Sequence, residues 1–186
     1  TDAIVTLNAV NGAGIDLTIN SGTAATNFDG IVGGSAGVGA IALTGGLDLD
    51  AAITDAESIS VSLASNLGAA ITTTGTAATT ITLSDAATLS AATTLTTANT
   101  NISLEAVDGA QTLTLVAGTG NITTSAAMTQ VTTMTVTSAT TATFAAVTNA
   151  TETQLDSTGT NTFGGILTSP TVDINAGTTT FSGVVT

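Results

Sequence analysis

Three short segments near the end of the chain decide the fold: Ala142-Thr-Phe144-Ala-Ala-Val147, Asn161-Thr-Phe163-Gly-Gly-Ile166 and Thr179-Thr-Phe181-Ser-Gly-Val184. Each segment has a Thr-Phe pair, two small residues and a β-branched residue, and the phenylalanines recur every 18 to 19 residues. A period near 20 with alternating apolar residues indicates a strand-based solenoid, in which each repeat forms one coil.

Apolar residues upstream of these segments recur at a similar period and predict three inward-facing columns. The first column is Ile41, Ile59, Ile81, Ile102, Ile122, Phe144, Phe163 and Phe181; the second is Leu95, Leu115, Val136, Leu155 and Ile174; the third is Val107, Met128, Val147, Ile166 and Val184. Phe28 looks like an early copy of the phenylalanine unit. Alternate side chains of a strand point to opposite faces, so the Thr, Ser and Asn residues between the columns are expected outside.

These columns predict an all-β fold, a right-handed parallel β-solenoid of about nine coils of 18–22 residues. We expect one domain over residues 1–186, with an irregular glycine-rich segment at 30–46. Residues 30–47 are uncharged, but seven of these 18 residues are glycine, which opposes a membrane-spanning helix. An antiparallel, pilin-like β-sandwich is the alternative fold, and it differs in lacking parallel neighbours one period apart.

The charge of the chain excludes several classes of function. The chain has no Lys, Arg or His and 13 acidic residues, giving a formal net charge of −13. Nucleic acids and anionic membranes are bound mainly through Lys and Arg, so neither is an expected partner. Without His, Lys or Cys, no usual general base or activated nucleophile is available at neutral pH. We therefore predict that the protein is not an enzyme.

Four acidic residues within ten positions are the candidate metal ligands. Asp48, Asp50, Asp55 and Glu57 could supply hard oxygen atoms for Ca²⁺, although their spacing is not that of an EF-hand. The alternative is that these carboxylates are solvated and that Ca²⁺ acts as a nonspecific counter-ion. The pairs Asp48/Asp50 and Asp55/Glu57 could also act on a polysaccharide, but the chain has no Trp or Tyr against which a sugar could stack.

Threonine and asparagine patterns provide two further candidate sites. Thr-x-Thr strings stacked on one flat face would resemble ice-binding β-solenoids; they occur at Thr112/Thr114, Thr133/Thr135/Thr137, Thr141/Thr143, Thr158/Thr160/Thr162 and Thr178/Thr180. Threonine also simply suits exposed strand positions. Glycosylation acceptor patterns occur at Asn101, Asn121 and Asn149. Asn101 and Asn121 lie one coil apart, so they could instead form a ladder at a turn.

The phenylalanine units resemble the degenerate repeats in β-solenoid passengers of autotransporters and in filamentous-haemagglutinin-like exoproteins. The resemblance is clearest over residues 95–186. It implies a secreted bacterial surface protein, located outside the cell or on its surface, that acts as an adhesin or fibre and contacts surface glycans. Since no polar cap is recognised at either end, we expect the coils to continue, in a homopolymer or a longer chain, by strand addition. Ice binding and polysaccharide binding or cleavage remain alternative functions, and no cofactor beyond Ca²⁺ is expected.

Overall fold

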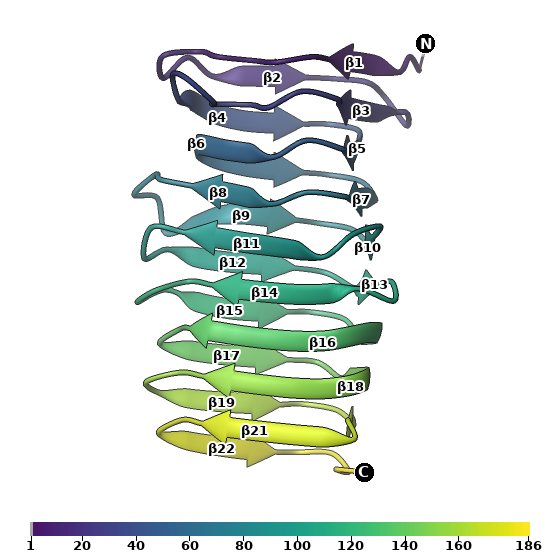
Figure 1. The fold of residues 1–186 in the computed structure, drawn as a ribbon, viewed down its shortest axis with the longest axis vertical. Helices are drawn as coiled ribbons and strands as arrows, with labels where there is room; N and C mark the ends of the chain where they lie inside the picture. The colour runs from purple at the N-terminus through teal and green to yellow at the C-terminus, as the bar shows by residue number, and fades with distance from the viewer. Residues whose placement is uncertain (1) are drawn as a thin grey trace.

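The computed structural model describes residues 2–186 as a rod of stacked β-coils. All 22 strands belong to one sheet, every recorded pairing is parallel, and the chain makes about nine turns. The two ends of the chain lie at opposite ends of the rod, as Figure 1 shows. The prediction of a parallel β-solenoid is confirmed, and the antiparallel sandwich is wrong because strands one period apart are hydrogen-bonded parallel neighbours.

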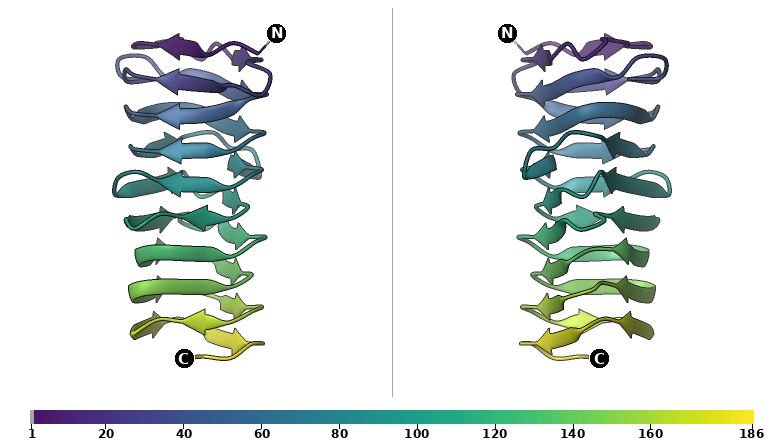
Figure 2. Two further views of the ribbon diagram at one scale, coloured as in Figure 1. Left: turned by 90° about the vertical axis from the view of Figure 1, so that its right-hand side faces the viewer. Right: turned by 90° about the vertical axis from the view of Figure 1, so that its left-hand side faces the viewer.

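Each coil contributes to three faces, which the side views of Figure 2 show as separate stacks of strands. The first face contains β1 (Val5–Leu7), β3 (Ala25–Phe28), β5 (Gly46–Leu49), β7 (Ser65–Leu67), β10 (Ala87–Leu89), β13 (Val107–Asp108) and β20 (Leu167–Thr168). The second contains β8 (Ile71–Thr73), β11 (Thr93–Thr97), β14 (Thr112–Val116) and β21 (Thr171–Asn175).

The third face, like the first, has a strand in every coil. It contains β2 (Leu17–Ile19), β4 (Val38–Leu43), β9 (Thr79–Leu83), β12 (Asn101–Leu104), β15 (Asn121–Thr124), β17 (Thr141–Phe144), β19 (Thr160–Phe163) and β22 (Thr178–Phe181). Three long strands turn a corner and serve two faces. These are β6 (Ile53–Val61), which joins the second and third faces, and β16 (Met128–Ser138) and β18 (Val147–Asp156), which join the first and second.

The second predicted column is one continuous ladder. In register, Leu95 pairs with Leu115, Leu115 with Val136, Val136 with Leu155, and Leu155 with Ile174. The first four of these residues are buried, and Ile174 in the last coil is partly buried. Stacking equivalent side chains in this way removes apolar surface from water in every coil, which is the main favourable contribution to folding.

The first predicted column combines two different ladders. Ile41, Ile59, Ile81, Ile102 and Ile122 stack in register, but Ile122 then pairs with Ala142, followed by Asn161 and Thr179. The ladder of Phe144, Phe163 and Phe181 lies two residues further along each strand, below Leu83, Leu104 and Thr124. A shift of two residues keeps a side chain on the same face, so apolar periodicity alone does not separate the ladders.

Two further register assignments are wrong. Val147 pairs with Leu167, and Leu167 bridges Val185, so the neighbouring Ile166 and Val184 point outward and are 51% and 60% exposed. A one-residue slip moves a side chain to the opposite face. Phe28 belongs to the first face, where it stacks between Leu7 and Leu49, and is therefore not an early copy of the third-face phenylalanines.

The glycine-rich segment is more regular than expected. Within it, residues 30–37 and 44–45 lie outside the strands, and Val32 still bridges Val10 and Ile53 in the second face. Residues 38–43 form β4. At Gly33, φ is +80° and a Cβ atom would lie 2.3 Å from the Asp55 carbonyl oxygen, so this position needs glycine.

Candidate functional site

The four carboxylates expected to bind Ca²⁺ lie at different places on the third coil. Asp48 is in β5 on the first face, where its Oδ1 accepts a hydrogen bond from Asn66 Nδ2 at 2.8 Å. Asp55 lies in β6, and its Oδ1 accepts a hydrogen bond from the Thr74 hydroxyl at 2.7 Å. Within residues 2–186, no three acidic side chains gather closely enough to hold a metal ion. The structure therefore does not bring Asp48, Asp50, Asp55 and Glu57 into one site.

A different carboxylate, Asp2 in the first coil, has a perturbed pKa. The Thr23 hydroxyl donates a hydrogen bond to Asp2 Oδ2. This bond, together with a hydrogen bond from the Thr23 backbone, stabilises the carboxylate and holds the pKa of Asp2 below its usual value. The interaction joins the first and second coils and suggests no catalytic role.

The asparagines with glycosylation patterns have structural contacts. Asn101 Oδ1 accepts a hydrogen bond from the backbone N–H of Asn121, and Asn121 Oδ1 accepts one from the Thr141 hydroxyl, each at 2.8 Å. These bonds form a ladder across three coils. Asn149 is 4% exposed and donates from Nδ2 to Thr153 Oγ1 at 2.8 Å. A glycan could not reach this amide in the folded chain, so Asn149 is unsuited as an acceptor.

The third face carries an uncharged ladder on its outer side, polar at every position except Ala42. The residues in register from the first coil to the last are Thr18, Ala42, Ser60, Thr82, Ser103, Thr123, Thr143, Thr162 and Thr180. A parallel row contains Asn101, Asn121, Thr141, Thr160 and Thr178 in the later coils. The Thr-x-Thr pairs of the last three coils therefore coincide, and neither row contains a charged residue.

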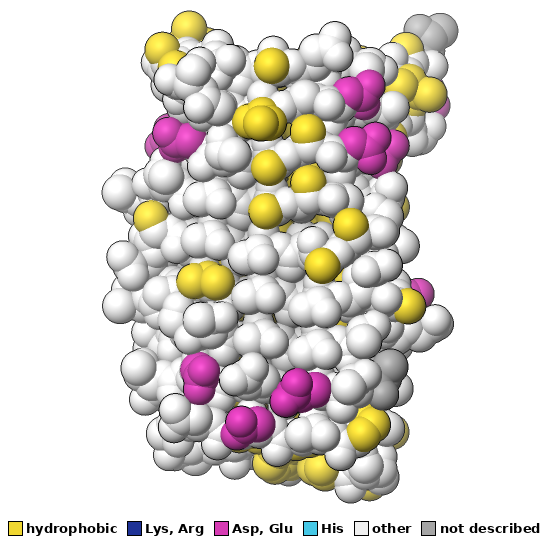
Figure 3. Space-filling model, viewed as in Figure 1, with side chains coloured by type: hydrophobic (Ala, Val, Ile, Leu, Met, Phe, Trp, Pro, Cys, Tyr) yellow, Lys and Arg dark blue, Asp and Glu magenta, His cyan; other side chains and the backbone are white. Residues whose placement is uncertain are grey.

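The remaining threonine strings lie on the second face. Thr112 pairs with Thr133 and Thr114 with Thr135, so two Thr-x-Thr pairs stack there. In the next coil Glu152 and Gln154 take their places, followed by Thr171 and Asp173. Figure 3 shows carboxylates gathered near the C-terminal end of the face in view. The threonine strings are thus divided between two faces, and of these two only the third face keeps its rows uncharged through the last coil.

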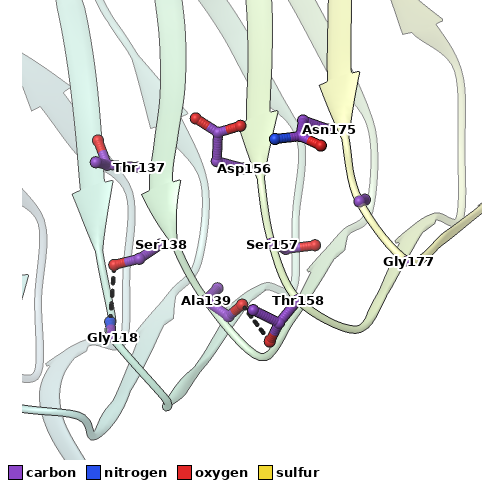
Figure 4. A pocket seen from close by; sticks show the side chains of 10 residues that line it. Gly118, Thr137, Ser138, Ala139, Asp156, Ser157, Thr158, Asn175 and Gly177 are labelled. Atoms are coloured by element: carbon purple, nitrogen blue, oxygen red, sulfur yellow. Dashed lines mark hydrogen bonds between the residues drawn. The ribbon is translucent and has the colours of Figure 1, made fainter.

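A polar groove runs along the corner between the second and third faces near the C-terminal end. It has a volume of about 430 Å³, and its lining residues are Gly118, Thr137, Ser138, Ala139, Asp156, Ser157, Thr158, Asn175, Ala176 and Gly177. Figure 4 shows Thr137, Asp156 and Asn175 in a row on three successive strands. Ser138 Oγ accepts a hydrogen bond from the Gly118 N–H at 3.1 Å, which fixes one wall.

This groove was not predicted, although the sequence contains a signal for it. Thr137, Asp156 and Asn175 each follow a member of the second apolar column, Val136, Leu155 and Ile174. Once this column is known to be a ladder, the next residue of each coil must lie outside and also stack in register. A second hollow lies on the first face, bordered by Leu47, Asp48, Ser65, Asn66 and Thr88.

Comparison with protein-family models, curated proteins and solved structures finds no match for this chain. Residues 2–186 include no helix that is long and apolar enough to cross a membrane.

Proposed function

We propose that the chain is a structural and adhesive module of an extracellular fibre, in which the rod is lengthened by addition of further coils. The observation that carries this proposal is the open aromatic stack at the last coil. The rings of Phe144 and Phe163 stack with centroids 5.4 Å apart, and those of Phe163 and Phe181 stack at 5.3 Å. Phe163 is fully buried, whereas Phe181 is 40% exposed because no ring covers its outer side.

The first coil has a corresponding open surface. Leu7, Val10, Leu17 and Ile19 are only partly buried there, although they occupy the ladder positions that are buried in later coils. The backbone groups on the outer side of each end coil are also free to pair with another strand. A further coil, from the same chain or from another copy, would cover both the apolar side chains and the backbone. A head-to-tail contact of this kind does not close and so produces a filament.

The composition supports a location outside the cell or on its surface. The chain has no Lys or Arg, so it offers no cleavage site to trypsin-like proteases. With 13 carboxylates and no basic side chain, repulsion between copies opposes assembly, and bound Ca²⁺ or high salt would weaken that repulsion. Ca²⁺ thus acts in this proposal as a counter-ion and is not required for the fold.

The test is to measure whether the purified 186-residue chain is monomeric or assembled over a range of protein, salt and Ca²⁺ concentrations. Light scattering and electron microscopy should show filaments that lengthen with concentration and whose width is that of one rod. Phe181→Asp should prevent elongation, whereas Thr114→Asp, which adds the same charge at mid-rod, should reduce it much less. A wild-type chain that stays folded and monomeric under all these conditions would contradict the proposal.

Ice binding is the second candidate function, and the uncharged ladder of the third face favours it. Hydroxyl groups repeat there about every 4.8 Å along the rod and about every 6.6 Å across neighbouring outward positions of a strand. Such a flat, regular array can order water molecules in two directions. Thermal hysteresis and ice-crystal shaping are the measurements, and Thr143→Tyr should reduce both by breaking the flat surface. No crystal shaping at high concentration would exclude this candidate.

A further inference from the structure

The corner groove differs from the rest of the surface in combining a hollow with a regular row of hydrogen-bonding groups. Asp156 pairs in register with Asn175, and Thr137 follows Val136, which pairs with Leu155. The three side chains therefore lie one coil apart, at about 4.8 Å intervals. The adjoining surface consists of small residues, so a ligand could approach the backbone closely. These residues are Gly118, Ala139, Ala176 and Gly177. The volume of about 430 Å³ lies in the range of small-molecule sites.

The buried side of the groove has an additional polar group. Ser157 lines the groove and donates from Oγ to Asn161 Oδ1 at 2.9 Å. Asn161 is fully buried inside the rod, and its Nδ2 has no hydrogen-bond partner among the described residues. The hydrogen bond to this buried side chain fixes the orientation of the Ser157 hydroxyl. The Ser157 oxygen remains able to accept a hydrogen bond from a ligand.

The chemistry of the lining selects among ligand classes. The Thr137 hydroxyl and the Asn175 amide can each donate and accept hydrogen bonds, and the Asp156 carboxylate accepts them. A metal ion would use only the acceptors, whereas a sugar hydroxyl uses both kinds of group. An anionic glycan would be repelled, because the chain has 13 acidic residues and no Lys, Arg or His. A neutral polyhydroxyl ligand fits these constraints best.

We infer that this groove binds a neutral saccharide chain lying along the rod axis. Hydroxyl groups of successive sugar units bond to Thr137, Asp156 and Asn175, since an extended pyranose chain repeats at a length close to the spacing of the coils. Without aromatic side chains for stacking, binding rests on hydrogen bonds, and affinity for a single chain is therefore modest. The inference rests on the adhesive part of the proposed function and supplies its ligand class.

The test measures binding of cellohexaose, laminarihexaose and chitohexaose to the ¹⁵N-labelled 186-residue chain by NMR titration. At least one should shift the backbone amide signals of the groove in a saturable way. Asp156→Ala should weaken that binding about tenfold or more, because hydrogen bonds to a charged acceptor are the stronger kind. Asp29→Ala removes an exposed carboxylate from the second coil and should leave the affinity unchanged.

Two further measurements keep the inference open to contradiction. Ala176→Leu should fill the groove and also weaken binding. This second variant provides the test if circular dichroism shows that Asp156→Ala does not fold. A hexamer of galacturonic acid should bind more weakly than the neutral chains. The inference is overturned if none of the three neutral hexamers binds, if the groove variants bind as tightly as wild type, or if the uronate or Ca²⁺ alone occupies the groove more tightly.

Filament formation separates this inference from the fibre proposal. Asp156→Ala alters the side of the rod in the coil before the last and leaves the apolar surfaces of the end coils in place. This variant should therefore assemble as the wild type does. Assembly without saccharide binding would contradict only the inference, whereas binding by a chain that stays monomeric would contradict only end-to-end assembly.

Discussion

Replacement of the central phenylalanine in the third-face stack should destabilise the rod more than replacement of the terminal one. Phe163 is fully buried between two aromatic rings, whereas Phe181 is 40% exposed and stacks on one side only. Both side chains occupy the same ladder, so the comparison varies the surroundings while it keeps the residue type constant.

The expected magnitudes follow from burial and stacking. A buried Phe→Ala change costs about 3–5 kcal/mol of unfolding free energy. Each aromatic pair contributes about 0.5–1.5 kcal/mol beyond its buried area. Phe163→Ala loses two pairs and should lie near the top of the range, at about 4–5 kcal/mol. Phe181→Ala loses one pair and less buried area, so we expect about 1–2 kcal/mol.

Urea unfolding followed by far-ultraviolet circular dichroism is the appropriate assay, because the chain has no Trp or Tyr to report by fluorescence. Measurements belong at low protein concentration, where assembly does not contribute. Thr162→Ala, a change at a half-buried neighbour on the outer side of the same strand, is the control and should stay within about 0.5 kcal/mol of wild type. The slope of the free energy against urea shows whether the coils still unfold together.

Two results would refute the reasoning. Equal losses for Phe163→Ala and Phe181→Ala, with unchanged slopes, would mean that the stack is not part of the cooperative core. A loss below about 1.5 kcal/mol for Phe163→Ala would mean that the rod relaxes around the cavity. A smaller slope of the unfolding free energy against urea in Phe163→Ala alone would mean that the last two coils unfold separately from the rest. This is possible because each coil of a solenoid contacts only its neighbours.

Three further predictions concern charge, a buried amide and the turns. Raising NaCl from about 0.01 M to 0.5 M should raise the thermal midpoint, since screening weakens repulsion among 13 carboxylates and no basic side chain supplies an ion pair that salt could weaken. Asn161→Val should stabilise the chain by about 1 kcal/mol in urea unfolding, because removing an unpaired buried Nδ2 and restoring a β-branched residue to the ladder of Ile122 outweigh the loss of the hydrogen bond from the half-buried Ser157 hydroxyl; a clear loss of stability would show that this bond to Asn161 Oδ1 contributes more. Gly120→Ala should cost more than 1 kcal/mol, since its Cβ would lie 2.1 Å from the Thr100 carbonyl oxygen, whereas Gly164→Ala, with no atom nearer than 3.6 Å, should be neutral or slightly stabilising; equal effects would contradict this reasoning.

The sequence predicted the fold because one ladder remains apolar across many coils. Leu95, Leu115, Val136, Leu155 and Ile174 keep a spacing of 19 to 21 residues and form one ladder in the structure. The prediction fails where polar or small residues enter the interior. The isoleucine ladder continues as Ala142, Asn161 and Thr179, and these residues give no apolar signal.

Buried threonines explain why composition alone could not identify the whole interior. Thr73, Thr80, Thr97 and Thr100 are all buried, and their hydroxyls bond to one another or to a nearby carbonyl. The Thr73 and Thr80 hydroxyls, for example, lie 2.8 Å apart. A buried hydroxyl is tolerated when it has such a partner. In this chain threonine therefore occupies both sides of the strands, and the presence of a threonine does not show which side faces the interior.

The candidate sites depend on register to a greater degree than the fold does. Four carboxylates that are close in sequence lie at separate places on one coil, whereas Thr137, Asp156 and Asn175 are 19 residues apart and form one row. In a solenoid, residues one period apart are neighbours about 4.8 Å apart, closer than many residues of the same coil. Functional groups in such a rod therefore accumulate along its axis, and a surface row is found by aligning coils before searching for chemistry. For the same reason, a ligand that repeats along its own length is the natural partner of this surface.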